Sequence, residues 1–207
     1  MGKRTLLSLC DYSGAWSAPY QAAGYAVIRV DLAHPPGLTR AADGAWLIGG
    51  DVCEYTPGVK PWAVIAAPPC TCFCRPGARW WTKMDATGQT ARDIAVFRAC
   101  LRLCHMAQAW WALENPPGRH IRLIPELGTP AWQYTPCEYG DPWHKQTYIW
   151  GTALKPTPQK RVPVPPTIRS PSGHTSGRIA RMSSTWKRER EKTPPGFAAA
   201  FFRWNPL

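Results

Sequence analysis

The chain has 207 residues, which is enough for one sizeable hydrophobic core. Its hydrophobic content of 44% excludes a wholly disordered chain, and the lack of any apolar run of about eighteen residues argues against a membrane span. The net charge of +12 favours a polyanionic partner, most simply nucleic acid, over a basic protein with no such partner.

The first apolar run is short and is interrupted at Asp11, so it does not predict a signal peptide. We expect a cytoplasmic protein. The eight cysteines do not predict a disulfide scaffold in a chain of this length. They do not predict a metal site either, because no pair has the CxxC spacing of structural zinc.

Apolar runs and turns alternate through most of the chain. In chain order, they predict a strand over 5–10, a helix over 16–23, strands over 26–31, 45–48 and 62–67, a helix over 85–108, and strands over 110–113 and 148–150. This alternation is typical of an α/β fold with a parallel sheet covered by helices on both faces.

Short polar motifs follow the predicted strands. They are Asp11–Gly14, Asp31, Asp51, Pro68-Pro69-Cys70 and Glu114-Asn115-Pro116. Ligands of such sheets bind beyond the carboxyl ends of the strands. We therefore expect these motifs to share one edge and to form a site.

The composition changes after the last predicted strand. Residues 155–192 are rich in Pro, Ser, Arg and Lys, and the segment 195–204 returns to an apolar helical pattern. We predict a catalytic and cofactor-binding domain over 1–154, a basic DNA-binding or reduced target-recognition segment over 155–192, and a C-terminal helix within 193–207 that packs on the core.

Cys70 follows two prolines at the end of a predicted strand, on a stiff stretch of backbone. A positioned thiol is a candidate nucleophile, although an ordinary cysteine in a Pro-rich turn fits the motif equally well. Glu114 follows another strand in mostly apolar sequence, where a carboxylate needs a task or a partner. It is a candidate acid, or a capping or ion-paired residue.

The acidic residues after the earlier strands suit a nucleotide cofactor. Asp31 holds the position that meets a ribose hydroxyl in nucleotide-binding sheets, and Asp51 follows two glycines where it can meet an adenine. Asp11 and Gly14 lie in the first turn, where the backbone must approach a cofactor closely.

Taken in order, these motifs resemble the DNA cytosine-5 methyltransferase family over roughly residues 5–151. The series continues through Tyr139–Pro142, Lys145 and Trp150-Gly151, and 194–198 resembles the family's last cofactor motif. In its compact size the chain resembles phage-encoded members of the family, which act in a bacterial host cell. The resemblance implies a Rossmann-like sheet and S-adenosylmethionine as the cofactor.

The resemblance also implies a mechanism. Cys70 attacks carbon 6 of a flipped-out cytosine, Glu114 protonates the ring nitrogen, and carbon 5 receives a methyl group. Asn115 orients Pro-Pro-Cys, and Lys145 faces the base or its phosphate. The implied cofactor-binding residues are Asp11, Ser13, Gly14, Trp16, Asp31, Leu32, Asp51, Val52 and Pro68. The expected nucleic-acid-binding residues are Arg75, Arg79, Lys145, Arg178, Arg181, Lys187, Arg188 and Arg190.

The chain departs from the family pattern at three places. Tyr12 replaces a glycine of the first motif, which leaves open a modified cofactor or another transferred group. Thr71 and Phe73-Cys74 replace the Gln and Phe-Ser that follow Pro-Pro-Cys. The late motif has Trp143, Lys145 and Thr147, hence one cation where the family has two. The basic segment is short, so we expect relaxed specificity or a protein partner that supplies it.

Four alternatives remain at this level. Asn115-Pro116-Pro117-Gly118 resembles the motif of amino-methyltransferases, but Gly118 stands where they have an aromatic residue. An enzyme of the thymidylate synthase type uses a similar cysteine, normally followed by His, where this chain has Thr71. RNA cytosine methylation shares the chemistry. A non-catalytic nucleic-acid-binding protein on the same fold is the rival from another class.

Overall fold

The computed structural model describes residues 4–142, 144–158, 162, 168–169, 175–176 and 192–207. Its strands are β1 (Thr5–Leu9), β2 (Ala26–Arg40), β3 (Trp46–Gly49), β4 (Ala63–Ala66), β5 (Trp110–Asn115), β6 (Trp132–Tyr134), β7 (Thr147–Gly151), β8 (Ile168–Arg169) and β9 (Thr175–Ser176). Its α-helices are α1 (Ala18–Ala22), α2 (Trp81–Ala86), α3 (Gln89–Cys104), α4 (His120–Leu123) and α6 (Pro195–Trp204). Its 3-10 helices are η1 (Arg75–Trp80), η2 (Pro125–Leu127) and η3 (Pro136–Glu138).

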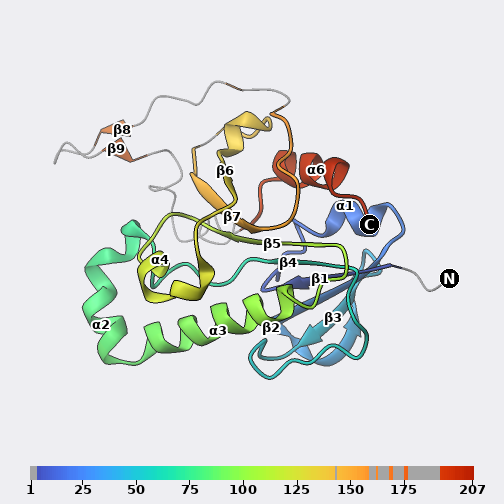
Figure 1. Cartoon of the computed structure of the whole chain (residues 1–207), viewed down its shortest axis with the longest axis horizontal. Coiled ribbons are helices and arrows are strands. Elements are labelled where there is room, and N and C mark those ends of the chain that lie inside the picture. The colour runs from blue at the N-terminus through green and yellow to red at the C-terminus, as the bar shows by residue number, and fades with distance from the viewer. Residues whose placement is uncertain (1–3, 143, 159–161, 163–167, 170–174, 177–191) are drawn as a thin grey trace.

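Seven strands form the main sheet in the order β3-β2-β1-β4-β5-β7-β6 (Figure 1). The order 3-2-1-4-5 is that of the Rossmann fold, and the chain reverses direction across the sheet between β1 and β4. The predicted Rossmann-like α/β fold is therefore confirmed. Beside the expected parallel strands, the sheet includes β7, which runs antiparallel to both β5 and β6.

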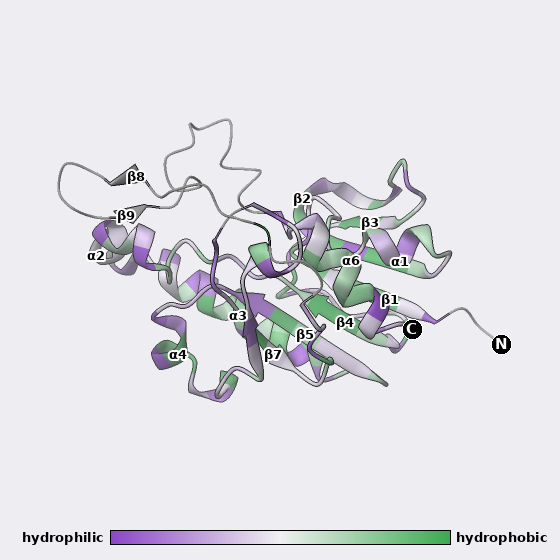
Figure 2. Cartoon of the chain, turned by 90° about the horizontal axis from the view of Figure 1, so that it is seen from above, coloured by the Kyte–Doolittle hydropathy of each residue, from purple (hydrophilic) through white to green (hydrophobic). Residues whose placement is uncertain are grey.

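Helices cover both faces of the sheet (Figures 1 and 2). On one face, Trp16 and Tyr20 pack with Phe197 and Phe201 of α6. On the other face, α3 lies along the sheet, where Phe97 packs with residues of β1, β4 and β5. The carboxyl ends of the strands are thus held between two buried apolar layers.

Strand β2 is longer than predicted because it pairs with β3 twice. The first half of β2 runs in the same direction as β3, and Val30 pairs with Ile48 there. The chain then folds back, so the second half runs in the opposite direction along β3. There Leu38 pairs with Ile48, and Arg40 pairs with Trp46. Asp31 therefore lies within β2 rather than after it.

Two other predicted elements changed, and one strand was not predicted. The helix expected over 85–108 is divided between α2 and α3 at Gly88, whose φ of +73° is left-handed, and α3 ends at Cys104. The helix expected over 16–23 is limited to α1, and β6 was not predicted. The helix expected over 195–204 matches α6, which packs on the core as predicted.

Candidate active site

The carboxyl ends of β1, β4 and β5 lie at one edge of the sheet, where β2 also turns back. Leu9 pairs with both Val30 and Ala66, so β1 and β4 end level with the residue that precedes Asp31 in β2. Strand β7 begins at this same edge, because its Tyr148 pairs with Asn115 at the end of β5. The edge therefore brings together the loops that carry the candidate residues Asp11, Asp31, Cys70, Glu114 and Lys145.

Cys70 lies in a tight turn after β4. Its carbonyl oxygen accepts hydrogen bonds from the backbone N–H groups of Phe73 (2.9 Å) and Cys74 (3.0 Å). Asn115, which has no exposed surface, donates from Nδ2 to the Pro68 carbonyl oxygen at 2.8 Å. The turn is thus held from within and from β5, which is the positioning that the family resemblance implied for Asn115.

Glu114 and Asn115 are the last residues of β5, not the residues after it, because pairing with β7 extends the strand. Glu114 is buried, and its Oε1 lies 3.5 Å from Lys145 Nζ. The Lys145 ammonium also interacts electrostatically with the thiols of Cys70 and Cys74. Two thiols, one carboxylate and one ammonium therefore share this end of the sheet.

The charge of Lys145 is stabilised in this cluster. Burial lowers its pKa, but the charges of Glu114 and Cys70 outweigh burial, and the pKa is raised above its ordinary value. Lys145 is therefore a cation at neutral pH. A cation beside a cysteine favours the thiolate form that acts as a nucleophile.

The two thiols of the cluster are not equivalent. Cys74 is buried, and its Sγ donates a hydrogen bond to the Cys70 carbonyl oxygen at 2.9 Å. Hydrogen bonding with the Cys70 side chain, and burial after it, raises the pKa of Cys74. Cys70 is partly exposed. Cys74 therefore stays a thiol, and Cys70 is the more accessible of the two.

Arg119, which the sequence interpretation missed, ties the loop after β5 to the Cys70 turn. Its Nε donates to the Cys72 carbonyl oxygen at 2.8 Å, and its two Nη atoms donate to the Asp85 carboxylate at 2.6 and 2.8 Å. Its guanidinium lies over the Trp81 ring, 4.6 Å from the centroid. The sequence near Arg119 shows only a cation after a Pro-Pro-Gly turn. Its partner Asp85 is distant in sequence, so no local pattern predicts their contact.

The Asn115–Gly118 segment packs against the turn that carries Cys70. Gly118 forms a backbone bridge with Cys74, and the Arg119 N–H donates to the Phe73 carbonyl oxygen at 3.0 Å. The Asn115 side chain is fully buried among these groups. An amino-methyltransferase must present this side chain to its substrate, so the structure argues against that alternative.

The loop after β1 is organised around Asp11. This buried carboxylate accepts hydrogen bonds from Ser8 Oγ and Ser17 Oγ, each at 2.9 Å, and from Ser13 Oγ at 3.4 Å. Burial raises its pKa, and the serine hydrogen bonds and Arg29 partly oppose that shift. Asp11 therefore shapes the turn that leads to the left-handed Gly14.

A cavity of about 510 Å³ that opens widely to solvent lies beside this loop. Among the lining residues, His34 is only 7% exposed, and its Nε2 has no hydrogen-bond partner within the described residues. Burial lowers the pKa of His34, so its ring is neutral. The Tyr12 ring lies 5.4 Å from the His34 ring. The lining residues are Tyr12, Ser13, Arg29, Ala33, His34, Pro35, Ala41 and Leu47.

The other predicted cofactor residues differ in exposure. Asp31 and Asp51 each accept a hydrogen bond at 2.8 Å, from the backbone N–H groups of Ala33 and Cys53. Leu32 is exposed, whereas Val52 and Pro68 are buried. Trp16 needs correction, because its side chain has no exposed surface and packs on Phe197 and Phe201. It supports the core instead of facing a cofactor.

Only some of the residues predicted to bind nucleic acid lie in the described part of the chain. Arg75 and Arg79 are exposed on η1, whereas Lys145 lies in the polar cluster beside Glu114. Residue Trp143 of the late motif lies outside the described residues, as do the basic residues Arg178, Arg181, Lys187, Arg188 and Arg190.

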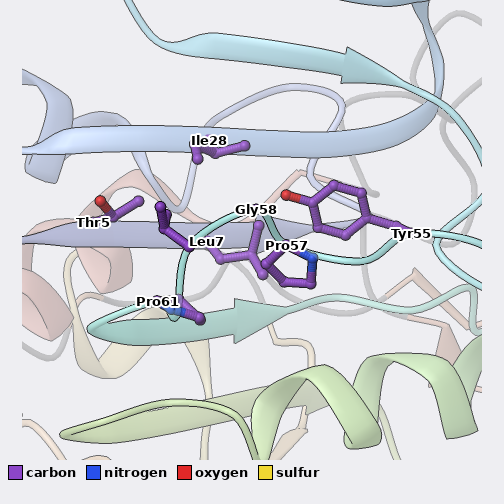
Figure 3. Close-up of a pocket in the computed structure, with 8 residues that line it drawn as sticks. Thr5, Leu7, Ile28, Tyr55, Pro57, Gly58 and Pro61 are labelled. Atoms are coloured by element: carbon purple, nitrogen blue, oxygen red, sulfur yellow. The ribbon is translucent and has the colours of Figure 1, made fainter.

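A second cavity, lined by Leu7, Ile28 and Tyr55 among others, has a volume of only about 20 Å³ (Figure 3). That is close to the space one water needs, so it is not a ligand site. Among the described residues, no group of His, Cys, Asp or Glu is arranged to hold a metal ion. None of the helices in the described part of the chain is long and apolar enough to cross a membrane.

No protein-family model matches the chain, and no curated protein matches its sequence. Among solved structures, it is similar to the glycopeptide N-methyltransferase MtfA complexed with S-adenosyl-L-homocysteine, with 12% identity and a TM-score of 0.33 over 75% of this chain and 55% of that one. It is also similar to MtfA complexed with S-adenosyl-L-methionine, with 11% identity and a TM-score of 0.31 over 75% and 61% of the two chains. The chain thus spans less than two thirds of the length of these structures.

Proposed function

We propose that this protein transfers a methyl group from S-adenosylmethionine to carbon 5 of cytosine in DNA through a covalent Cys70 adduct. The observation that carries the proposal is the cluster of Cys70, Glu114 and Lys145 beside the reversal point of a Rossmann-like sheet. A nucleophile, an acid and a cation at neighbouring strand ends are the groups that this chemistry requires.

Residues at the β1 and β2 side of this edge fit the cofactor. The cavity beside Tyr12 and Ser13 has a volume of about 510 Å³, and His34 is among the residues that line it. Asp31 and Asp51, which lie outside the lining of that cavity, would hold the ribose and the adenine. S-adenosylmethionine, when bound, supplies a methyl group on a positively charged sulfur.

The chain's own residues perform the remaining steps. The Lys145 ammonium stabilises the Cys70 thiolate, whose sulfur forms a bond to carbon 6 of the cytosine. As that bond forms, the carbon 5–carbon 6 electron pair shifts to join carbons 4 and 5, the carbon 4–nitrogen pair moves to the ring nitrogen, and Glu114 in its acid form gives that nitrogen a proton, which makes carbon 5 nucleophilic. After methylation the nitrogen returns its proton to Glu114, and water takes the carbon 5 proton. The carbon 5–carbon 6 double bond then forms again as the bond from carbon 6 to sulfur breaks and the Cys70 thiolate leaves.

DNA as the substrate is supported by charge. The net charge of +12 favours a polyanion, and Arg75 and Arg79 are exposed on the helix that follows the Cys70 turn. A buried target atom in a stacked base must be extruded before a thiol can reach it.

The direct test is trapping. The protein is incubated with S-adenosylmethionine and DNA carrying 5-fluorocytosine, whose carbon 5 has no proton to lose. We expect a denaturation-resistant adduct with wild type and none with Cys70→Ala. Cys53→Ala, which removes another exposed thiol, is the matched control and should still form the adduct.

Mass spectrometry of nucleosides from treated DNA and RNA identifies the base and the added group. 5-Methylcytosine from DNA alone supports the proposal, and a different group would point to a modified cofactor. An adduct that persists in Cys70→Ala, or no modified nucleoside with either nucleic acid, contradicts a catalytic role and favours a non-catalytic nucleic-acid-binding protein.

A further inference from the structure

The helices that follow the Cys70 turn expose one aromatic and three basic side chains. We call the surface of Arg75, Arg79, Trp80 and Lys83 the η1–α2 face. All four residues are exposed, and Trp80 keeps 48% of its surface in solvent.

The charge of this face is not neutralised within the described residues. The nearest acid in sequence, Asp85, is engaged by Arg119. In the described part of the chain, no ion pair includes Arg75, Arg79 or Lys83. Arg79 lies over the Trp80 ring, with Cζ 5.1 Å from the centroid. The face therefore offers positive charge and an aromatic plane together.

The face is attached firmly to the turn that carries Cys70. The Gly77 N–H donates to the Cys74 carbonyl oxygen at 3.0 Å, and a Cβ on Gly77 would lie 2.5 Å from the Thr71 carbonyl oxygen. Only glycine allows this approach. On the other side of Trp80, Arg119 stacks on Trp81 and bonds Asp85. Trp80 thus lies between two anchored segments in the part of the chain that follows the Cys70 turn.

We propose that the η1–α2 face binds the substrate DNA strand next to the target cytosine, with Trp80 stacked on an unpaired base. Arg75, Arg79 and Lys83 contact the flanking phosphates. Phosphates match the charge, and an aromatic plane binds any base whose face is uncovered. Paired bases in a duplex have both faces covered, so this arrangement favours single-stranded or locally unpaired DNA. The inference rests on the proposed function and narrows its substrate.

Binding experiments test Trp80 directly. Fluorescence anisotropy measures the affinity of the full chain for a labelled single strand and for the matched duplex. We expect Trp80→Ala to weaken single-strand binding about five- to hundredfold, whereas Trp80→Phe retains most of it. Trp204→Ala is the matched control, because Trp204 is also half-exposed at a helix end, at 42%. Thermal unfolding checks that all variants fold.

The basic residues are tested by salt dependence. Each phosphate contact on a single strand contributes about 0.7 to the slope of log affinity against log salt. The double variant Arg79→Gln/Lys83→Gln should lower that slope by about 1.4, and the exposed Lys60→Gln should leave it unchanged. Single-strand binding by Trp80→Ala equal to wild type, or an equal loss in Trp204→Ala, overturns the proposal. A preference of wild type for the duplex overturns it as well.

The experiments distinguish failure of this inference from failure of the proposed function. Adduct formation through Cys70 with normal binding by Trp80→Ala means that the chemistry holds and the stacking inference fails. No adduct, combined with weakened binding by Trp80→Ala, means that the face binds DNA while the methyl-transfer proposal fails.

Discussion

The two halves of the sheet edge are built differently. Around β4, β5 and β7, side chains join one loop to the next, as Asn115 does to Pro68 and Lys145 does to Glu114. Around β1 and β2, Asp11 bonds serines of its own loop and helix, and an open cavity with the unpartnered His34 Nε2 remains. The first half is assembled before a substrate arrives, and the second retains space for a ligand.

This difference follows from what each half has to do. Groups that act on developing charge must hold their geometry without ligand, since reorganisation during the reaction raises the barrier. A cofactor site needs volume and unsatisfied polar atoms, which the ligand itself completes. Changes in the first half should therefore affect turnover, and changes in the second should affect cofactor affinity or folding.

The largest effect is expected at Glu114. Glu114→Gln keeps the shape of the side chain but removes the proton, so turnover should fall about 10²- to 10⁴-fold while DNA binding survives. The rate of 5-methylcytosine formation and the anisotropy of bound DNA measure the two properties. Unchanged turnover would remove the proton-transfer role.

Variants of Trp16 test whether this side chain supports the core, as its burial indicates, or binds the cofactor, as the sequence predicted. Trp16→Ala deletes a fully buried indole and should lower the free energy of unfolding by about 3–5 kcal/mol. Trp16→Phe should cost less. Denaturant titration measures both variants. A Trp16→Ala variant that is as stable as wild type but binds the cofactor poorly would restore the original prediction.

His34 should influence cofactor affinity alone. The His34 side chain lines the cavity, so His34→Ala should weaken S-adenosylmethionine binding about tenfold, the value of one contact of about 1.4 kcal/mol. Isothermal titration calorimetry gives the affinity. His105→Ala, at an exposed ring on Trp111, is the control and should bind normally. Equal affinities for wild type and His34→Ala would place the cofactor elsewhere.

The smallest effect concerns pH. The hydrogen bond from Arg119 lowers the pKa of Asp85 from 3.8 to about 2. A carboxyl with a lowered folded-state pKa stabilises the fold above pH 3.8, and this stabilisation disappears as the pH falls through about 2. The melting temperature of wild type should exceed that of Asp85→Asn near neutral pH. The gap should close between pH 4 and pH 2.

Exposed Asp51→Asn is the control for this experiment and should melt like wild type throughout. A gap between wild type and Asp85→Asn that stays constant down to pH 2 would show that the ion pair contributes nothing in solution.

The sequence predicted the strands because each is an apolar run ended by Pro, Gly or Asp, and it predicted one shared edge because parallel strands end together. Contacts between distant segments, such as Arg119 with Asp85, leave no local pattern. The break at Gly88 depends on a left-handed backbone that an isolated glycine in a helical pattern does not reveal. Trp16 was misassigned because an aromatic residue near a loop does not show which way its ring points.

The return of β2 along β3 has a consequence for association between molecules. A terminal strand with free N–H and C=O groups is a template for pairing with another chain. Residues Pro36–Arg40 pair along the outer side of β3, so its backbone groups are used within the molecule. The returning segment is then the margin on that side, and Pro36 within it has no backbone N–H to offer another chain. At the opposite margin, β6 is only three residues long. Short margins and a proline at the edge both oppose edge-to-edge aggregation.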